Sequence, residues 1–160
     1  MSLKSILLFA VAALSAAFSL GVAAQLPYGP SVTLEQAQKA AAAAAAEARR
    51  NNWSMAVAVV DTSGELVLLH KMDNTQIGSI NIAIGKARSA AKFKRPTKVF
   101  QDLLAKGSEF TFIMTLEGAV PVQGGIPIVM DGKIVGAIGL SGATGPQDVQ
   151  CAEAGLAALK

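Results

Sequence analysis

The sequence contains very few of the residues that build metal centres and covalent cross-links. Among 160 residues there is one cysteine, Cys151, and one histidine, His70. A single cysteine excludes an intramolecular disulfide, and one cysteine with one histidine cannot supply the ligands of a zinc site. No Cys-x-x-Cys-His motif is present, which excludes the covalent attachment of a c-type haem. We therefore predict no metal site built by the protein alone.

Charged residues are also sparse, and their balance argues against nucleic acid as a partner. They make up 16% of the chain and give a formal net charge of only +3. An excess this small does not produce the basic surface that nucleic-acid binding needs.

The catalytic residue types are equally few. A Ser-His-Asp set would have to use His70, and no Gly-x-Ser-x-Gly elbow is present, although Gly139-Leu140-Ser141-Gly142 comes near. The carboxylates suitably placed for acid–base chemistry are Asp61, Glu117 and Asp148. We assign no catalytic residue from this set.

The one long apolar run lies at the N-terminus. Lys4 is followed by uncharged, mostly apolar residues 6–22 and then by Ala23-Ala24. This order is typical of a secretory signal peptide cleaved after Ala24. A retained membrane anchor is the alternative, although the run is slightly short for a bilayer span of about 20 residues. We expect a signal peptide over 1–24, an extended leader over 25–32 and one domain over 33–160. The protein would then be periplasmic or secreted, without stable membrane insertion.

The rest of the chain predicts an α+β domain. Thr33 and Gln36 form a capping box that opens a helix over residues 34–50, whose alanine face suits close packing on a sheet or on a second subunit. Further helices are expected over 75–93, 97–104 and 146–159, and strands over 55–61, 65–72, 110–116, 126–130 and 134–140. Hairpin connections imply an antiparallel five-stranded sheet packed with about four helices as a two-layer sandwich.

A glycine-rich stretch over residues 118–142 is the centre of this predicted fold. Asp131-Gly132 between two apolar runs predicts a type I′ hairpin. Gly136, Gly139 and Gly142 follow in the second run, where glycine marks a place that a ligand or another backbone approaches closely. Tight packing of a helix over the hairpin is the alternative explanation.

Three features outside this stretch bear on ligand binding. His70 could be an axial ligand to a metal or haem, or an ordinary strand side chain. Residues 86–98 hold six basic side chains and no acid, and this basic patch could bind a carboxylate or phosphate or form a solvated face. Its members are Lys86, Arg88, Lys92, Lys94, Arg95 and Lys98. Cys151 lies among alanines and leucines and is expected to be a small buried side chain and not a reactive thiol.

A series of short motifs runs along nearly all of the chain after the signal peptide. In order they are Val60-Asp61-x-x-Gly64, Lys71-Met72-Asp73, Gly85-Lys86-Ala87, Arg95-Pro96-Thr97, Gly124-Gly125-Ile126-Pro127, Asp131-Gly132, Val135-Gly136-Ala137-Ile138-Gly139-x-Ser141-Gly142 and Ala152-x-Ala154-Gly155-Leu156. This combination resembles the GlcG/HbpS-type family, often called the haem-degrading domain family. The resemblance implies an antiparallel sheet with helices, assembly into dimers and larger rings or octamers, and haem or corrinoid-related binding in some members.

The chain differs in three respects from the members of that family that handle haem or corrinoids. Extracellular haem-binding members carry a Glu-x-x-Glu pair, linked with iron, just before the Lys-Ala of the second helix, where this chain has Asn81 and Ile84. Those members also have a threonine ahead of Gly-Gly, where this chain has Ala119. The histidine that cobalamin-associated relatives use near the start of the first helix is absent as well.

Together these features predict an exported protein that binds a small ligand, with haem or a related tetrapyrrole first. Apolar hairpin and strand residues would grip the porphyrin, the basic patch would pair with propionates, and His70 or a methionine would approach the iron. An enzyme or binder for a small organic acid is one alternative, with Lys86 or Arg88 as anion anchor and the amides of Gly124-Gly125 and Ser141-Gly142 as an anion nest. The other alternative is a ligand-free assembly module. In each case we expect a homo-oligomer.

Overall fold

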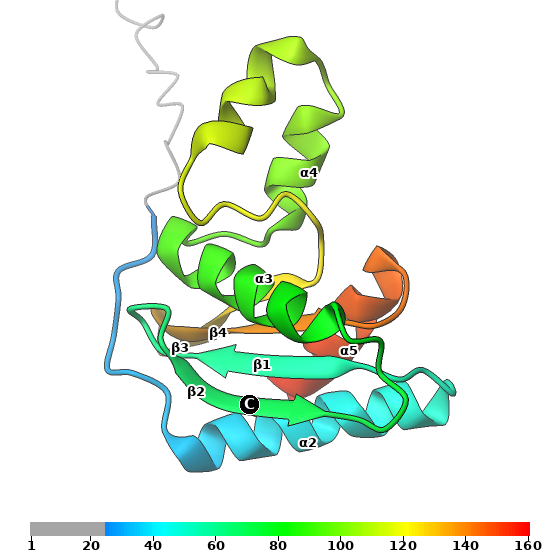
Figure 1. The fold of residues 1–160 in the computed structure, drawn as a ribbon. Helices are drawn as coiled ribbons and strands as arrows, with labels where there is room; N and C mark the ends of the chain where they lie inside the picture. The colour runs from blue at the N-terminus through cyan, green and yellow to red at the C-terminus, as the bar shows by residue number, and fades with distance from the viewer. Residues whose placement is uncertain (1–24) are drawn as a thin grey trace, which may run out of the picture.

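The computed structural model describes residues 25–160, and these form a sheet with helices on both faces (Figure 1). The predicted signal peptide, residues 1–24, lies outside the described residues. Within residues 25–160, no helix combines the length and the apolar character needed to cross a bilayer.

Four antiparallel strands make up the sheet, in the order β2-β1-β4-β3. The strands are β1 (Ala56–Val60), β2 (Leu66–Lys71), β3 (Gly125–Met130) and β4 (Lys133–Ser141). Strands β1 and β2 form one hairpin and β3 and β4 the other, as the sequence predicts. The second hairpin has positive φ at both turn residues, 48° at Asp131 and 70° at Gly132, which confirms the type I′ prediction.

The predicted fifth strand, residues 110–116, is wrong. This segment is a 3₁₀ helix, η1 (Ser108–Thr115), in which Ile113 is buried while Phe112 and Met114 are exposed. With α4 (Lys98–Leu104) it forms an arm that projects away from the sheet (Figure 1), so it meets no strand edge with which to pair. Thr111 and Thr115 instead donate their hydroxyls to carbonyls three residues earlier, which favours the helical turn.

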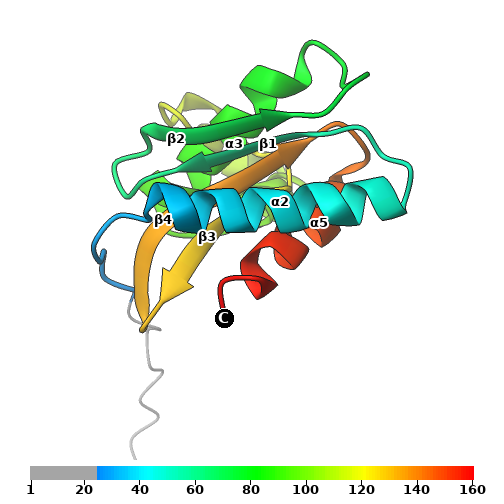
Figure 2. The same ribbon diagram turned by 90° about the horizontal axis from the view of Figure 1, so that it is seen from below.

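The structure has three layers and not the predicted two. Helix α3 (Ser79–Phe93) covers one face of the sheet, and α2 (Leu34–Arg50) and α5 (Gly145–Ala157) lie side by side on the other (Figure 2). The reason is that β1 has no polar face to leave in solvent, and it is buried along its whole length. Ala56, Ala58 and Val60 pack towards α3, while Val57 and Val59 pack towards α2 and α5.

Helix α2 begins and ends where the capping signals predict. The amide of Gln36 donates to Thr33 Oγ1 at 3.2 Å, and the amide of Thr33 donates to Gln36 Oε1 at 2.9 Å. The alanine face of α2 is buried against α5 and the sheet of the same chain. The alanine face is therefore not available for contact with a second subunit. The homo-oligomer stays a prediction.

The leader lies along the part of β4 that β1 does not reach. Strand β1 pairs only with residues 137–141 of β4. Before that point the amide of Ile134 donates to Pro27 O at 2.9 Å, and the amide of Gly29 donates to Ile134 O at 2.8 Å. These bonds order the leader as an extension of the sheet.

Candidate functional site

The glycines of the hairpin lie against the backbone of this chain. A Cβ atom on Gly139 would overlap Ala83 O and would lie 2.5 Å from Ala87 N, both in α3. A Cβ atom on Gly125 would overlap Lys86 O, and one on Gly142 would overlap Ser54 O. Packing of the chain on itself, including α3 over the hairpin, therefore accounts for these glycines without a ligand.

Lys86 is buried and paired with Asp148. Its Nζ donates to Asp148 Oδ2 at 2.7 Å and to Leu140 O at 2.9 Å, and the two side chains are only 2% and 3% exposed. Because Lys86 is on α3 and Asp148 is in the first turn of α5, the pair joins the two outer layers at the end of β4. Over residues 25–160, no buried side-chain nitrogen or oxygen is left without a hydrogen-bond partner.

The surroundings of Asp148 resemble the anion nest that the sequence offers to a ligand. Burial raises the pKa of Asp148, whereas the Lys86 ammonium and the backbone amides of Ala143 and Gly142 lower it. A Cβ atom on Gly124 would lie 2.9 Å from both Lys86 Nζ and Asp148 Cβ, so only glycine fits there. The structure thus brings Lys86, Gly124 and Gly142 together, around a carboxylate of the chain itself.

The remaining residues of the predicted nest have partners within the protein. The amide of Gly125 donates to Thr97 Oγ1 at 3.0 Å, and the hydroxyl of Ser141 lies 3.2 Å from that of Ser79. Neither group is directed at Lys86, so the predicted set does not form a single open site.

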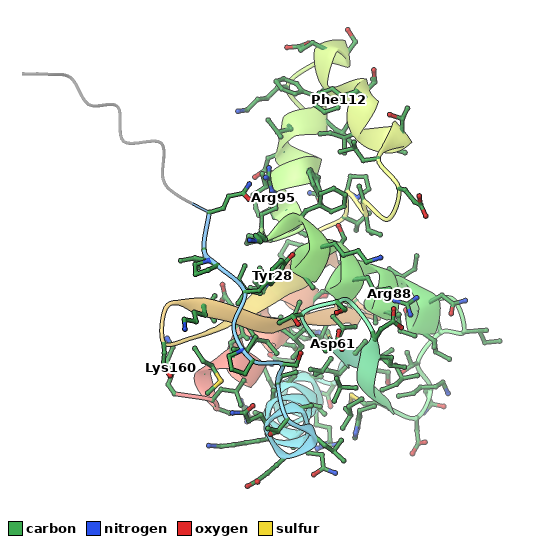
Figure 3. All side chains as sticks on the ribbon, turned by 90° about the vertical axis from the view of Figure 1, so that its left-hand side faces the viewer. Tyr28, Asp61, Arg88, Arg95, Phe112 and Lys160 are labelled. Carbon is green, nitrogen blue, oxygen red and sulfur yellow. The ribbon has the colours of Figure 1, made fainter. Side chains whose placement is uncertain are left out.

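The members of the basic patch other than Lys86 make separate contacts, and Arg88 and Arg95 lie well apart in Figure 3. Arg88 donates from Nε to Gly64 O at 3.0 Å, and Lys98 pairs with Asp102. Lys94 lies over the ring of Tyr28, with 4.2 Å from Nζ to the ring centroid. Their interactions are local, and they do not converge on one anion.

His70 lies on the face of the sheet opposite α3, between β2 and α2. It is paired in register with Val57, whose side chain faces α2. One hollow of about 320 Å³ is lined by Gln38, Ala41, Ala42, Arg49, Leu68, Leu69 and His70. A second hollow, of about 340 Å³, is lined by Arg49, His70, Lys71, Met72 and Asp73. Because both include Arg49 and His70, we call them together the α2–β2 groove.

Another hollow, which sequence reasoning did not indicate, lies between β3 and the end of α5. It has a volume of about 410 Å³ and is lined by Pro127, Ile128, Val129, Glu153, Leu156, Ala157, Leu159 and Lys160. Its walls contain no histidine, cysteine or methionine that could contact a haem iron. This hollow forms where the edge strand β3 packs on the end of α5. No local sequence pattern predicts that contact.

Cys151 is fully buried on α5, as expected. Burial, together with the nearby carboxylates of Glu47 and Asp148, raises the pKa of its thiol to about 11. The thiol therefore stays protonated at neutral pH, which confirms its role as a small packing side chain.

The three candidate acid–base carboxylates do not meet. Asp61 Oδ1 accepts the amides of Ser63 and Glu65 at 2.8 and 2.9 Å and so stabilises the β1–β2 turn. Glu117 is exposed in a loop, and Asp148 is buried with Lys86. No pair of them forms a general acid and a general base at one point.

The antiparallel sheet between α3 and the α2–α5 pair defines a small α+β domain with helices on both faces. The chain belongs to the HbpS-like family, since the family model described as haem degrading protein HbpS-like matches residues 32–157.

Known proteins similar to the chain include a bacterial sequence and two solved structures. Protein GlcG of Escherichia coli strain K12 is 40% identical over 95 residues, which are 59% of this chain and 69% of GlcG. The crystal structure of HbpS has a TM-score of 0.76 at 33% identity and covers 85% of this chain and 95% of its own. The crystal structure of a PduOC:heme complex has a TM-score of 0.74 at 25% identity and covers 80% and 94%.

Proposed function

We propose that this protein binds haem or a closely related tetrapyrrole. Two comparisons support the ligand class, because the family description names haem degradation and one similar structure is a haem complex. The observation that carries the proposal for this chain is the position of His70, its single histidine, beside an open and partly apolar groove.

The side chains of the groove fit a haem better than a free metal ion. Within the described part of the chain, no group of three or more histidine, cysteine, aspartate or glutamate side chains could hold a metal ion. At the positions of the family's iron-linked carboxylates, Asn81 is exposed on α3 and Ile84 packs on the core. Haem brings nitrogen ligands of its own for the iron, so the imidazole of His70 would be enough to hold it from the protein side.

Each wall of the groove would have a separate role. Ala42 on α2 and Leu68 on β2 would offer apolar surface to the porphyrin. His70 is held in position by the pairing of β2 with β1. The bound haem would supply iron chemistry, and the protein would supply the ligand, the apolar walls and the orientation.

The organic-acid alternative receives no support from the geometry. Of its two predicted anion anchors, Lys86 is buried and already donates to Asp148, and Arg88 donates to Gly64 O and lies 3.8 Å from Glu65. A ligand carboxylate would have to displace a carboxylate that is covalently part of the fold.

Haemin titration into the purified protein tests the proposal. The wild-type protein should shift the Soret band, and His70→Ala should weaken binding about tenfold or more, because an axial bond worth at least about 1.4 kcal/mol is lost. Lys98→Gln, a change on the distant arm, is the matched control and should bind as the wild type does. A spectrum identical to that of free haemin at saturating protein would refute haem binding.

We further propose that the protein acts after export. The support is the order of Lys4, the apolar residues 6–22 and Ala23-Ala24 in the sequence. The protein recovered from the periplasm or medium should begin at Gln25, and intact-mass spectrometry measures this. Recovery only in the membrane fraction with residues 1–24 retained would favour the anchor.

A further inference from the structure

We infer that the α2–β2 groove recognises carboxylates, so that it takes a porphyrin with free propionates and not a corrinoid with amide side chains. This inference rests on the proposed function, because it specifies which tetrapyrrole the same groove accepts.

The groove is apolar at one end and cationic at the other. Its α2 wall runs from Gln38 to Arg49, eleven residues that span about 16 Å at 1.5 Å per residue. The alanines Ala41 and Ala42 lie in the first part of that wall, and Arg49 lies in the last turn of the helix. A flat ligand with apolar faces and charges on one edge matches this polarity.

Arg49 is available to such a ligand, whereas its neighbour is not. Across residues 25–160, Arg49 takes part in no ion pair, while Arg50 pairs with Glu47. Glu47 also accepts from Asn51 and Gln150, so its carboxylate is directed towards those partners. The dipole of α2 favours a cation at its C-terminal end, where Arg49 lies. This attraction leaves most N–H donors of the Arg49 guanidinium available to a ligand.

The other charges of the groove are Lys71 and Asp73. Both are exposed, line only the second hollow and make no ion pair among the described residues. Together with Arg49 these charges leave the groove with an excess of one positive charge. The Arg49 guanidinium can hold a carboxylate with two parallel hydrogen bonds, which a neutral amide does not match.

Haemin, haemin dimethyl ester and cyanocobalamin separate these ligand classes. The wild type should bind haemin more tightly than the ester and should bind cyanocobalamin much more weakly than either. Arg49→Gln should raise the Kd for haemin about three- to tenfold, the range of a charged hydrogen bond at a partly exposed site, and leave the Kd for the ester unchanged. Arg50→Gln is the matched control and should change neither Kd.

The outcomes distinguish this inference from the proposed function. If haemin and its ester bind the wild type equally and Arg49→Gln changes neither, carboxylate recognition in the groove is refuted while haem binding stands. Cyanocobalamin binding as tight as haemin binding would refute the discrimination between ligand classes. If neither haemin nor its ester binds, both the inference and the proposed function fail. Circular dichroism of each variant confirms that the fold is retained.

Discussion

Replacing Lys86 with alanine is expected to lower the free energy of unfolding by about 3–5 kcal/mol, because Asp148 would stay buried without its cation. Lys86 Nζ donates to Asp148 Oδ2 at 2.7 Å, and both side chains are almost completely buried. Leu140 O would lose its lysine donor in the same variant. Urea denaturation of the variant and of the wild type, followed by circular dichroism, measures the difference.

Two further variants identify the cause. Lys92→Ala removes an exposed cation from the same helix and should change the free energy of unfolding by no more than about 0.5 kcal/mol. The double change of Lys86→Met and Asp148→Leu should recover most of the loss, because it leaves no unpaired buried charge. If Lys86→Ala were as stable as Lys92→Ala, the buried pair would not exist in solution.

The parts of this fold that could be predicted from the sequence have strong local signals. The turn at Asp131-Gly132 needs positive φ at both residues, and the start of α2 depends on Thr33 and Gln36 three residues apart. The presence of helices on both faces of the sheet could also be predicted, because β1 alternates small and larger apolar residues and has no polar face. That pattern is typical of a strand buried on both sides.

The fifth strand could not be rejected from local pattern alone. The segment around Phe112 is apolar and β-prone, but its structure depends on whether a sheet edge lies within reach. The arm formed by α4 and η1 carries it away from the sheet (Figure 1), and threonine hydroxyls bond within the turn. Tertiary placement therefore overrides strand propensity here.

The candidate sites required contacts between residues distant in sequence. Lys86, Gly124 and Gly142 were predicted to act together, and they do meet, but Asp148 lies 62 residues from Lys86 and reaches it from another layer. The α2–β2 groove likewise depends on Arg49, which only the packing of α2 on the sheet brings beside His70. Sequence spacing contains no information about how the helices are placed on the sheet.

Replacing Gly139 with alanine is expected to lower the free energy of unfolding by about 1–3 kcal/mol or more, the range for overpacking a tight interior. The added methyl group would overlap Ala83 O and would lie 2.5 Å from Ala87 N and 3.0 Å from Ala87 Cα. These are backbone atoms of α3, so relief requires the whole helix to move away from β4. Such a movement would also loosen the packing between α3 and β1.

Gly78→Ala is the matched control, because no atom lies within 4 Å of the added methyl group and φ is −62°. Its free energy of unfolding should stay within about 1 kcal/mol of the wild type, since alanine is a poorer N-cap than glycine. Equal stability of the two variants would mean that α3 lies farther from β4 in solution than in this structure. Gly139 would then be accessible to a ligand, and the β3–β4 hairpin would replace the α2–β2 groove as the candidate ligand-binding site.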